Sequence, residues 1–239
     1  MAKAPLVGEV KTRLVPPLTA SEAAALHVCF LRDMAASIGN VAANDSADGV
    51  LVYTPIGSKF AFDGILPDGF KLLPHRGESF GDRLCNAIED LLRSAYDSVC
   101  LINSDSPTLP QSVYDEAIKS LSRPGDRVVL GPADDGGYYL IGLKRVHSNL
   151  FDRIAWSTPT VLADTIERAA EIGVSVELLP RWYDVDDGAS LNLLCEELFS
   201  MHSPDGAYPA HHTREFLASL IANEGSQRIY PTLSQRMTS

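Results

Sequence analysis

Polar residues 103–110 directly follow a nearly continuous apolar run, Val99–Ile102. Such runs are typical of strands buried on both faces of a parallel sheet, and ligands of parallel α/β sheets bind where the strands end. Asp105 is therefore placed where a carboxylate could reach a metal ion bound to phosphates, since Mg²⁺ takes one or two carboxylates together with phosphates and water. A simple turn that leads into a helix at Pro110 explains the segment equally well.

A second acidic segment, at residues 182–187, also follows a predicted strand and opens a helix. Its three carboxylates repel one another unless cations or helix caps stabilise them. Asp187 is expected to cap the helix. Asp184 and Asp186 flank Val185 and can point the same way in an extended segment, so that one of them could bind a metal. A solvated acidic turn is the alternative.

Two further segments carry candidate residues. Residues 131–139 join two predicted strands, and their paired glycines permit close approach of the backbone to a ligand. Asp134 or Asp135 could orient an acceptor or act as a base there, although a plain Asp-Gly hairpin turn would look the same. In residues 3–14, Lys11 and Arg13 suit a polyphosphate, because arginine offers a bidentate fork and lysine a point charge. A solvated basic terminus is the alternative, and neither GxxxxGK[ST] nor GxGxxG is present.

Composition limits the classes of function. The 239 residues contain 31 acidic and 20 basic side chains, a formal net charge of -11 without a basic stripe, which argues against nucleic acid as a partner. No apolar run approaches the roughly 18 residues of a membrane helix, and the first residues lack a signal peptide's apolar core. The four scattered cysteines favour reduced core thiols over a zinc site. We therefore expect a cytoplasmic protein without a transmembrane segment.

Predicted strands and helices alternate along most of the chain, which indicates a three-layer α/β domain with a mostly parallel sheet. Thr19 and Glu22 form a capping box for a first helix that reaches about Ile38. Thr158 is expected to cap a later helix with Pro159 at its first position. We predict a transferase domain over residues 1–200, and over residues 201–239 a C-terminal extension with one helix and a loose tail.

Taken in order, the segments resemble the nucleotide-diphospho-sugar-transferase-like proteins of GT-A fold, a family labelled as domain of unknown function 2064 or as glycosyltransferases and related to molybdopterin and phospholactate guanylyltransferases. The resemblance spans residues 2 to about 194 and rests on segments 2–14, 80–84, 104–109, 131–143, 156–158 and 184–186. Each segment alone is weakly specific, whereas their common order is strongly so.

The resemblance implies a Rossmann-like nucleotide-binding domain and a divalent metal, Mg²⁺ or Mn²⁺. Its nucleotide-binding residues would be Lys11, Arg13, Gly8 and Asp82, and its metal ligands Asp105 and Asp186. This sequence departs from the family in one respect, because the usual Asp-x-Asp is reduced to Asn103-Ser104-Asp105. A metal held there would depend on Asp186 and on phosphate.

The start of the chain is a second departure. The phosphate loop of this fold follows a first strand inside the sheet, whereas here the loop pattern begins at Ala2, so we expect that strand to be missing or truncated. A central strand buries several side chains at about 1.5–3 kcal/mol each, a large part of a net stability of about 5–15 kcal/mol. We therefore expect the natural start to lie upstream of Met1, and the short form to be less stable or less soluble.

The combined prediction is a metal-dependent transferase that uses a nucleotide-activated donor, with a nucleotide sugar favoured and a small-molecule acceptor that the sequence does not define. A nucleotidyltransferase that transfers a nucleoside monophosphate from a triphosphate to a phosphorylated acceptor would use nearly the same residues. The third possibility is a nucleotide-binding protein without catalytic activity. The sequence defines neither the nucleobase nor the oligomeric state.

Overall fold

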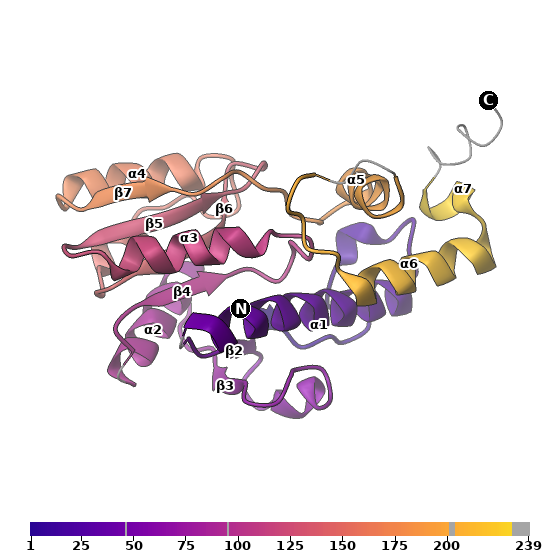
Figure 1. Cartoon of the computed structure of the whole chain (residues 1–239), viewed down its shortest axis with the longest axis horizontal. Helices are drawn as coiled ribbons and strands as arrows, with labels where there is room; N and C mark the ends of the chain where they lie inside the picture. Colours follow the sequence, from indigo (N-terminus) through magenta and orange to yellow (C-terminus); the bar gives the residue numbers. More distant parts are fainter. Residues whose placement is uncertain (46, 95, 201–203, 231–239) are drawn as a thin grey trace.

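The computed structural model describes residues 1–45, 47–94, 96–200 and 204–230. Strands and helices alternate through most of this part of the chain (Figure 1). The strands are β1 (Ala2–Lys3), β2 (Val50–Thr54), β3 (Lys71–Pro74), β4 (Val99–Ile102), β5 (Arg127–Pro132), β6 (Tyr138–Leu143) and β7 (Ser175–Leu178). The α-helices are α1 (Ala20–Asp45), α2 (Phe80–Arg93), α3 (Gln111–Ser122), α4 (Val161–Glu171), α5 (Gly188–Phe199), α6 (His211–Glu224) and α7 (Ser226–Ile229).

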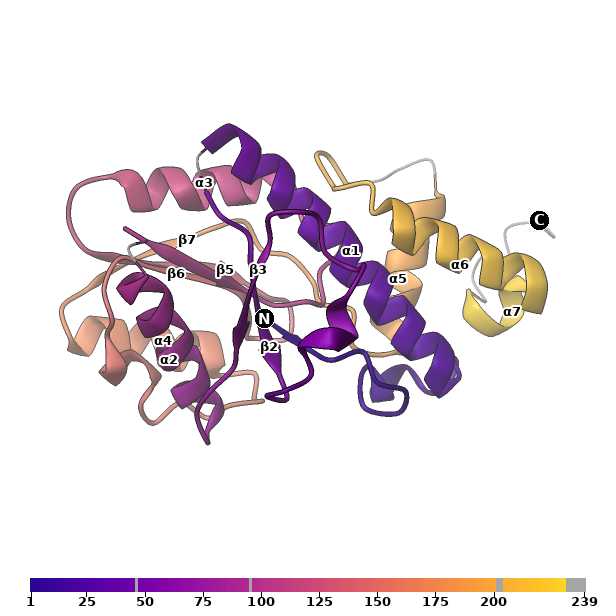
Figure 2. The same ribbon diagram turned by 90° about the horizontal axis from the view of Figure 1, so that it is seen from below.

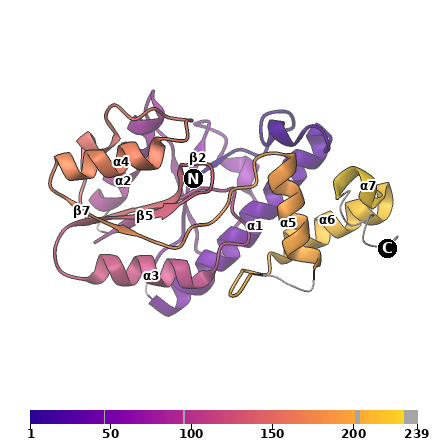
Figure 3. The ribbon, with the colours of Figure 1, turned by 90° about the horizontal axis from the view of Figure 1, so that it is seen from above.

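The strands form the middle of three layers. Helices α2 and α4 cover one face of the strands and α1 and α3 cover the other (Figures 2 and 3). Side chains alternate accordingly along β5, because successive residues of a strand point to opposite faces. Val128 and Leu130 belong to the core that contains α2, whereas Val129 belongs to the core that contains α3. The three-layer α/β architecture predicted from the sequence is confirmed.

The strands are divided between two hydrogen-bonded sheets. The first has the order β1-β2-β3 and is parallel throughout. The second has the order β4-β6-β5-β7, in which β6 runs antiparallel to both neighbours and β7 runs parallel to β5. The expected mostly parallel arrangement therefore holds in three of the five strand pairs, and the hairpin of β5 and β6 supplies the antiparallel ones.

The first strand is present but short. Strand β1 pairs with β2 at only two positions, Ala2 with Tyr53 and Lys3 with Thr54. The amino group of Met1 donates a hydrogen bond to the carbonyl of Ile102 in β4 at 2.6 Å. The first strand, which the sequence predicted to be missing or truncated, is thus present with two residues, and among the described residues no strand pair joins β2 to β4.

Local signals locate some helix ends and not others. The capping box of α1 is confirmed, since Glu22 N donates to Thr19 Oγ1 at 3.2 Å and Thr19 N to Glu22 Oε2 at 2.7 Å. Helix α1 continues well beyond the predicted end near Ile38. The predicted start of α4 is wrong: its N-cap is Thr160, because the Thr158 hydroxyl donates to the Ala155 carbonyl at 2.7 Å and forms a preceding turn.

Helices α5, α6 and α7 lie together at one end of the molecule, beside α1 (Figure 1). Leu217 of α6 and Ile229 of α7 share one buried core with Leu26 and Phe30 of α1. Residues 204–230 therefore contain two helices, where the sequence predicted one. The predicted loose tail falls largely on residues 231–239, outside the described residues, and the division of domains stays a prediction. Within the described segments, no helix is both long and apolar enough to cross a membrane.

Candidate functional site

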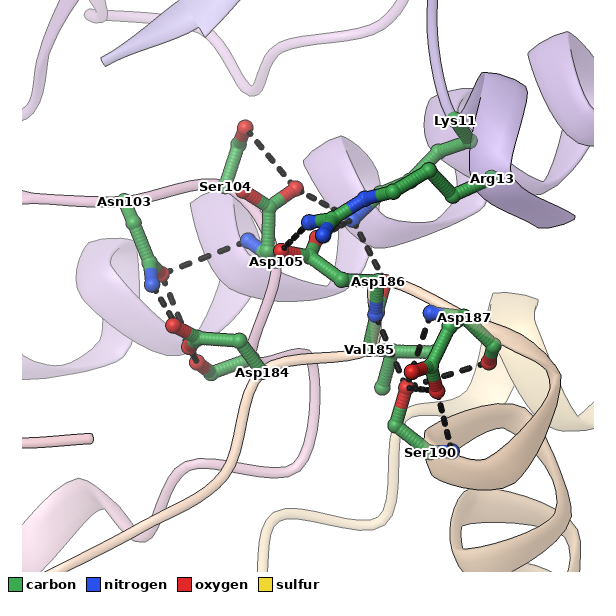
Figure 4. Close-up of polar contacts among 11 residues, drawn as sticks. Lys11, Arg13, Asn103, Ser104, Asp105, Asp184, Val185, Asp186, Asp187 and Ser190 are labelled. Atoms are coloured by element: carbon green, nitrogen blue, oxygen red, sulfur yellow. Dashed lines mark hydrogen bonds and ion pairs between the residues drawn. The ribbon is translucent and has the colours of Figure 1, made fainter. Parts of the chain in front are cut away.

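Four charged side chains from three distant segments meet beyond the ends of β1 and β4 (Figure 4). Lys11 Nζ lies 2.5 Å from Asp105 Oδ1 and 3.2 Å from Asp186 Oδ1. Arg13 Nη2 lies 2.6 Å from Asp186 Oδ2. We call Lys11, Arg13, Asp105 and Asp186 the cation–carboxylate cluster. The structure thus brings together the two predicted phosphate-binding cations and the two predicted metal ligands.

Lys11 is the centre of the cluster. Its ammonium also donates to the carbonyl of Val185 at 2.7 Å and lies 5.3 Å from the centre of the Phe30 ring. Only 5% of its side chain is exposed, whereas the side chain of Arg13 is 72% exposed. The backbone of Lys11 is left-handed, with φ 49° and ψ 36°. Such a conformation is uncommon outside glycine and concentrates at functional sites.

The carboxylates are held by the elements on either side of them. Asp105 follows β4, and its carbonyl accepts a hydrogen bond from Val185 N at 2.8 Å, which fixes the two acidic segments side by side. Asp186 N donates to Ser190 Oγ at 2.9 Å. Asp187 caps α5 by accepting from Ser190 N at 2.9 Å, as predicted. The cap therefore leaves the carboxylate of Asp186 available to the cluster.

Lys11 controls the ionisation of Asp105. Burial is the largest single cause and raises the pKa of this carboxyl group, whereas the charge of Lys11 and the hydrogen bond from it are the largest causes that lower the pKa. The result is a pKa below the ordinary value, and His27 and the amino terminus act in the same direction. Asp105 is therefore an anion at neutral pH, which is the form that a metal ion or a lysine requires.

Asp184, the alternative to Asp186 as a metal ligand in the sequence, lies partly buried behind the cluster and outside it. Asp184 accepts hydrogen bonds from Asn103 Nδ2 at 2.6 Å and from Ser106 Oγ at 2.5 Å. Burial raises the pKa of Asp184 to about 6, against the effect of these two donors. The network joins the segment after β4 to the segment before α5. The only signal for this network in the sequence is the alternation of Asp184 with Asp186, which does not reveal a partner such as Asn103, 81 residues away.

The cluster lies at a cavity of about 350 Å³. This volume is within the range of small-molecule sites, about 300–1,000 Å³. The cavity wall combines basic, acidic and aromatic side chains, among them Lys11, Arg13, Arg83, His75, Phe80, Asp105 and Asp186. Cations beside carboxylates suit a ligand that carries both phosphate groups and a bound divalent metal.

The donor set defines how a metal could be held. Among the described residues, no group of three or more histidine, cysteine, aspartate or glutamate side chains is arranged to bind a metal. The carboxylates of Asp105 and Asp186 converge on a single ammonium, and about a third of each side chain is exposed. Two carboxylates fit Mg²⁺ or Mn²⁺ only if phosphate oxygens and water complete the coordination, which is the usual arrangement for Mg²⁺.

Two of the predicted site residues lie in the hairpin between β5 and β6. Asp134 Oδ1 is 3.8 Å from Arg181 Nη1 and lines a separate cavity of about 470 Å³. Asp135 Oδ1 accepts from Gly137 N at 2.8 Å. Gly136 has a structural role, since a Cβ at this position would lie 2.1 Å from the carbonyl oxygen of Pro159. A catalytic role for either aspartate stays a prediction.

The remaining two predicted residues lie around the same end of the fold. Asp82 completes a capping box with Ser79 at the start of α2, and its Oδ2 accepts from Ser79 N at 3.0 Å. Gly8 has φ 79°, a left-handed conformation that favours glycine, in the loop that leads to Lys11. Asp82 thus has a structural role in the described contacts, and nucleotide binding by Asp82 or Gly8 stays a prediction.

Comparison with known proteins identifies the fold. The crystal structure of a "putative nucleotide-diphospho-sugar transferase" from Desulfovibrio desulfuricans G20 matches with a TM-score of 0.77 and 30% sequence identity, over 92% of this chain and 93% of that chain. CMP:2-keto-3-deoxy-manno-octonic acid synthetase in complex with CTP matches at a TM-score of 0.45 and 14% identity, over 67% of this chain and 85% of that chain, and carries no argument here. No curated protein matches.

The fold is therefore that of a nucleotide-diphospho-sugar-transferase-like α/β protein. A family model described as "Uncharacterized protein conserved in bacteria (DUF2064)" matches residues 37–158, about half of the chain. The chain belongs to this family, as the resemblance in its sequence implied. The model includes Asp105, whereas Lys11, Arg13 and Asp186 lie outside its matched range.

Proposed function

We propose that this protein is a metal-dependent transferase whose donor is a nucleotide-activated compound, with a nucleotide sugar as the favoured donor. The observation that supports this proposal is the cation–carboxylate cluster at a cavity of about 350 Å³. Its four side chains combine ligands for a divalent cation with donors for phosphate. The description of the similar crystal structure from Desulfovibrio desulfuricans is consistent with the same class of donor.

Each side chain of the cluster has a distinct role in this proposal. Asp105 and Asp186 would hold Mg²⁺ or Mn²⁺, which when bound neutralises charge on the diphosphate and on the leaving group. Lys11 now neutralises both carboxylates. With both carboxylates engaged by a divalent cation, the Lys11 ammonium would be able to donate to a phosphate oxygen. Arg13, which is largely exposed at the mouth of the site, would bind the diphosphate through its fork of donors.

The cluster would bind the phosphate groups of the donor, and this role is the same in sugar transfer and in nucleotidyl transfer. In sugar transfer the acceptor displaces a nucleoside diphosphate. In nucleotidyl transfer an acceptor phosphate attacks a nucleoside triphosphate and pyrophosphate leaves. Analysis of the released product separates the two, and a protein that binds nucleotide but turns over no acceptor would have a regulatory role instead. Asp134, beside its own cavity, is the candidate to orient an acceptor.

The first experiment is a thermal-shift screen of nucleoside diphosphates, triphosphates and nucleotide sugars, each with Mg²⁺, with Mn²⁺ and with a chelator. A ligand at a hundredfold excess over its Kd stabilises the native state by about 2.7 kcal/mol, which moves Tm by several degrees for a chain of this length. We expect shifts that require both the phosphates and the metal. Equal Tm values in all combinations, or shifts that the chelator leaves unchanged, would contradict the proposal.

A further inference from the structure

A second cavity, of about 470 Å³, lies apart from the cation–carboxylate cluster. Its volume is also within the range of small-molecule sites. No described residue lines both this cavity and the cavity at the cluster. Its walls come from the hairpin between β5 and β6, the segment before α5, and α5 itself, and they include Asp134, Arg181, Trp182, Tyr183, Glu196 and Glu197. We call it the hairpin–α5 cavity.

Carboxyl groups outnumber basic groups in the described lining of this cavity. Arg181 is its only basic residue, and its Nη1 donates to the carbonyl of Ala133 at 2.8 Å and lies 3.8 Å from Asp134 Oδ1. Burial raises the pKa of Glu197. With or without a charge on Glu197, the carboxylates of Asp134 and Glu196 leave the described lining negative. An anionic ligand would therefore meet charges of its own sign, which are costly across a binding site.

Two aromatic rings belong to the same lining. The rings of Trp182 and Tyr183 are stacked, with centroids 6.0 Å apart and an interplanar angle of 23°. The hydroxyl of Tyr183 donates to Glu197 Oε2 and lies 3.4 Å from Thr108 Oγ1, which fixes the Tyr183 ring. An aromatic face attracts a protonated amine, and carboxylates accept hydrogen bonds from amines and hydroxyls. The lining therefore suits a sugar that carries an amine.

The hairpin–α5 cavity and the cluster share one short segment of chain. Trp182 and Tyr183 line the cavity, whereas Asp186 belongs to the cluster (Figure 4). Because an extended chain spans at most about 3.6 Å per residue, the Cα atoms of Tyr183 and Asp186 are no more than about 11 Å apart. Asp134 N donates to the carbonyl of Trp182 at 3.0 Å, which fixes the hairpin to this segment. A compound in the cavity would therefore lie near a donor held at the cluster.

We propose that the hairpin–α5 cavity is the acceptor site of this protein and that it takes an amine-bearing sugar rather than a phosphorylated acceptor. The assignment of an acceptor rests on the proposed function, whereas the preference for an amine-bearing sugar rests on the lining of the cavity alone. Nucleotidyl transfer would require a phosphorylated acceptor. An acidic acceptor cavity therefore favours sugar transfer.

The two tryptophans of the chain provide one probe for each cavity. Trp182 lines the hairpin–α5 cavity. Trp156 packs edge-on against Phe80, which lines the cavity at the cluster, with ring centroids 5.0 Å apart. Their indole N–H signals in a proton–nitrogen correlation NMR spectrum are assigned with Trp156→Phe and Trp182→Phe. The ligands are glucosamine, glucose and glucose 6-phosphate, titrated at a slightly acidic pH that keeps the amine protonated, and UDP with Mg²⁺.

We expect glucosamine to shift the Trp182 signal saturably and to bind at least about tenfold more tightly than glucose 6-phosphate, with glucose between them. Glu196→Gln should weaken glucosamine binding about three- to tenfold, because it removes the charge of a partly exposed carboxylate and keeps its shape. Glu215→Gln, on α6 and outside the described lining, is the matched control and should leave this affinity unchanged. UDP with Mg²⁺ should move the Trp156 signal instead.

Equal affinities for glucosamine and glucose 6-phosphate would overturn the preference for an amine, as would a glucosamine response that Glu196→Gln leaves unchanged. If none of the three sugars moves the Trp182 signal saturably, the cavity is not the acceptor site, and a Trp156 response to UDP with Mg²⁺ would still support the proposed donor. If glucosamine moves Trp182 while UDP with Mg²⁺ moves neither signal, the nucleotide donor is refuted and the sugar preference of the cavity is supported.

Discussion

Replacing Lys11 by methionine removes one charge from the centre of the site while keeping most of the side chain's apolar length beside Phe30. In the native protein the ammonium of Lys11 is almost completely buried and bonds to Asp105, Asp186 and the carbonyl of Val185. The variant therefore leaves two facing carboxylates without their shared cation. Loss of one partner from a buried ion pair costs about 3–5 kcal/mol. Because about a third of each carboxylate is exposed, we expect about 1–3 kcal/mol at pH 7.

The loss should depend on pH in a defined direction. In the native protein the pKa of Asp105 lies below its ordinary value, so this residue contributes stability above about pH 4, which is lost as pH falls through the lowered pKa. Without Lys11 the burial of Asp105 dominates and raises its pKa. The ionised carboxylate then destabilises the variant at pH 7, and protonation relieves this as pH falls. The difference in the free energy of unfolding should therefore be largest at pH 7 and narrow toward about pH 4.5.

Urea denaturation followed by circular dichroism at several pH values measures this difference directly. Lys59→Met is the matched control, because Lys59 is exposed and also lies over an aromatic ring, that of Phe60. We expect the control to change stability by less than about 0.5 kcal/mol at every pH. A Lys11→Met variant as stable as the native protein, or one with the same deficit at all pH values, would refute the electrostatic account of the cluster.

Three further predictions concern other parts of the structure. Asp184→Asn should stabilise the protein at pH 7 by at most about 3 kcal/mol, because burial raises the pKa of Asp184 to about 6. The native protein should therefore lose stability as pH rises through roughly 4 to 6, whereas the variant should not. Free energies of unfolding that fall equally with pH in both proteins would count against this. Arg13→Ala should weaken binding of nucleoside diphosphates about three- to tenfold at low salt and by less at high salt, as measured by calorimetry. Binding of the nucleoside alone should be unchanged. Equal losses of affinity for both ligands would exclude a contact between Arg13 and phosphate. Leu217→Ala should lower the free energy of unfolding by about 2–5 kcal/mol, because the Leu217 side chain of α6 is fully buried in the core shared with α1. Leu193→Ala is the control and should have little effect, because Leu193 is 45% exposed. A small effect of Leu217→Ala in urea denaturation would mean that α6 contributes little to the core.

The features that the sequence predicted well depend on nearby residues or on the order of motifs. The capping residues Thr19 and Asp187 act within three residues along the chain, and both are confirmed. The buried strand Val99–Ile102 was visible as an apolar run, and it places Asp105 at its end. The three-layer architecture followed from the alternation of elements. The ion pairs of Lys11 with Asp105 and Asp186 could be expected only from the family resemblance, because they join residues that are far apart in the chain.

The features that were missed depend on tertiary contacts. Thr158 precedes a proline and looks like a cap, but its hydroxyl bonds back to Ala155 and the helix begins at Val161. The glycine at position 136 accommodates the carbonyl of Pro159, a chain segment whose approach no local pattern reveals. The hydrogen bonds of Asp184 to Asn103 and Ser106 likewise form only after β4 and the segment before α5 come together.

In the function we propose, Asp105 and Asp186 hold a divalent cation together with the diphosphate of a nucleotide. Calorimetry of UDP and GDP binding, with Mn²⁺ and with a chelator, tests it most directly when the native protein is compared with Asp105→Asn. The account predicts at least tenfold tighter binding with Mn²⁺ for the native protein, and no effect of Mn²⁺ on an Asp105→Asn variant whose circular dichroism shows a native fold. Diphosphate binding by that variant with the metal dependence of the native protein would contradict the account.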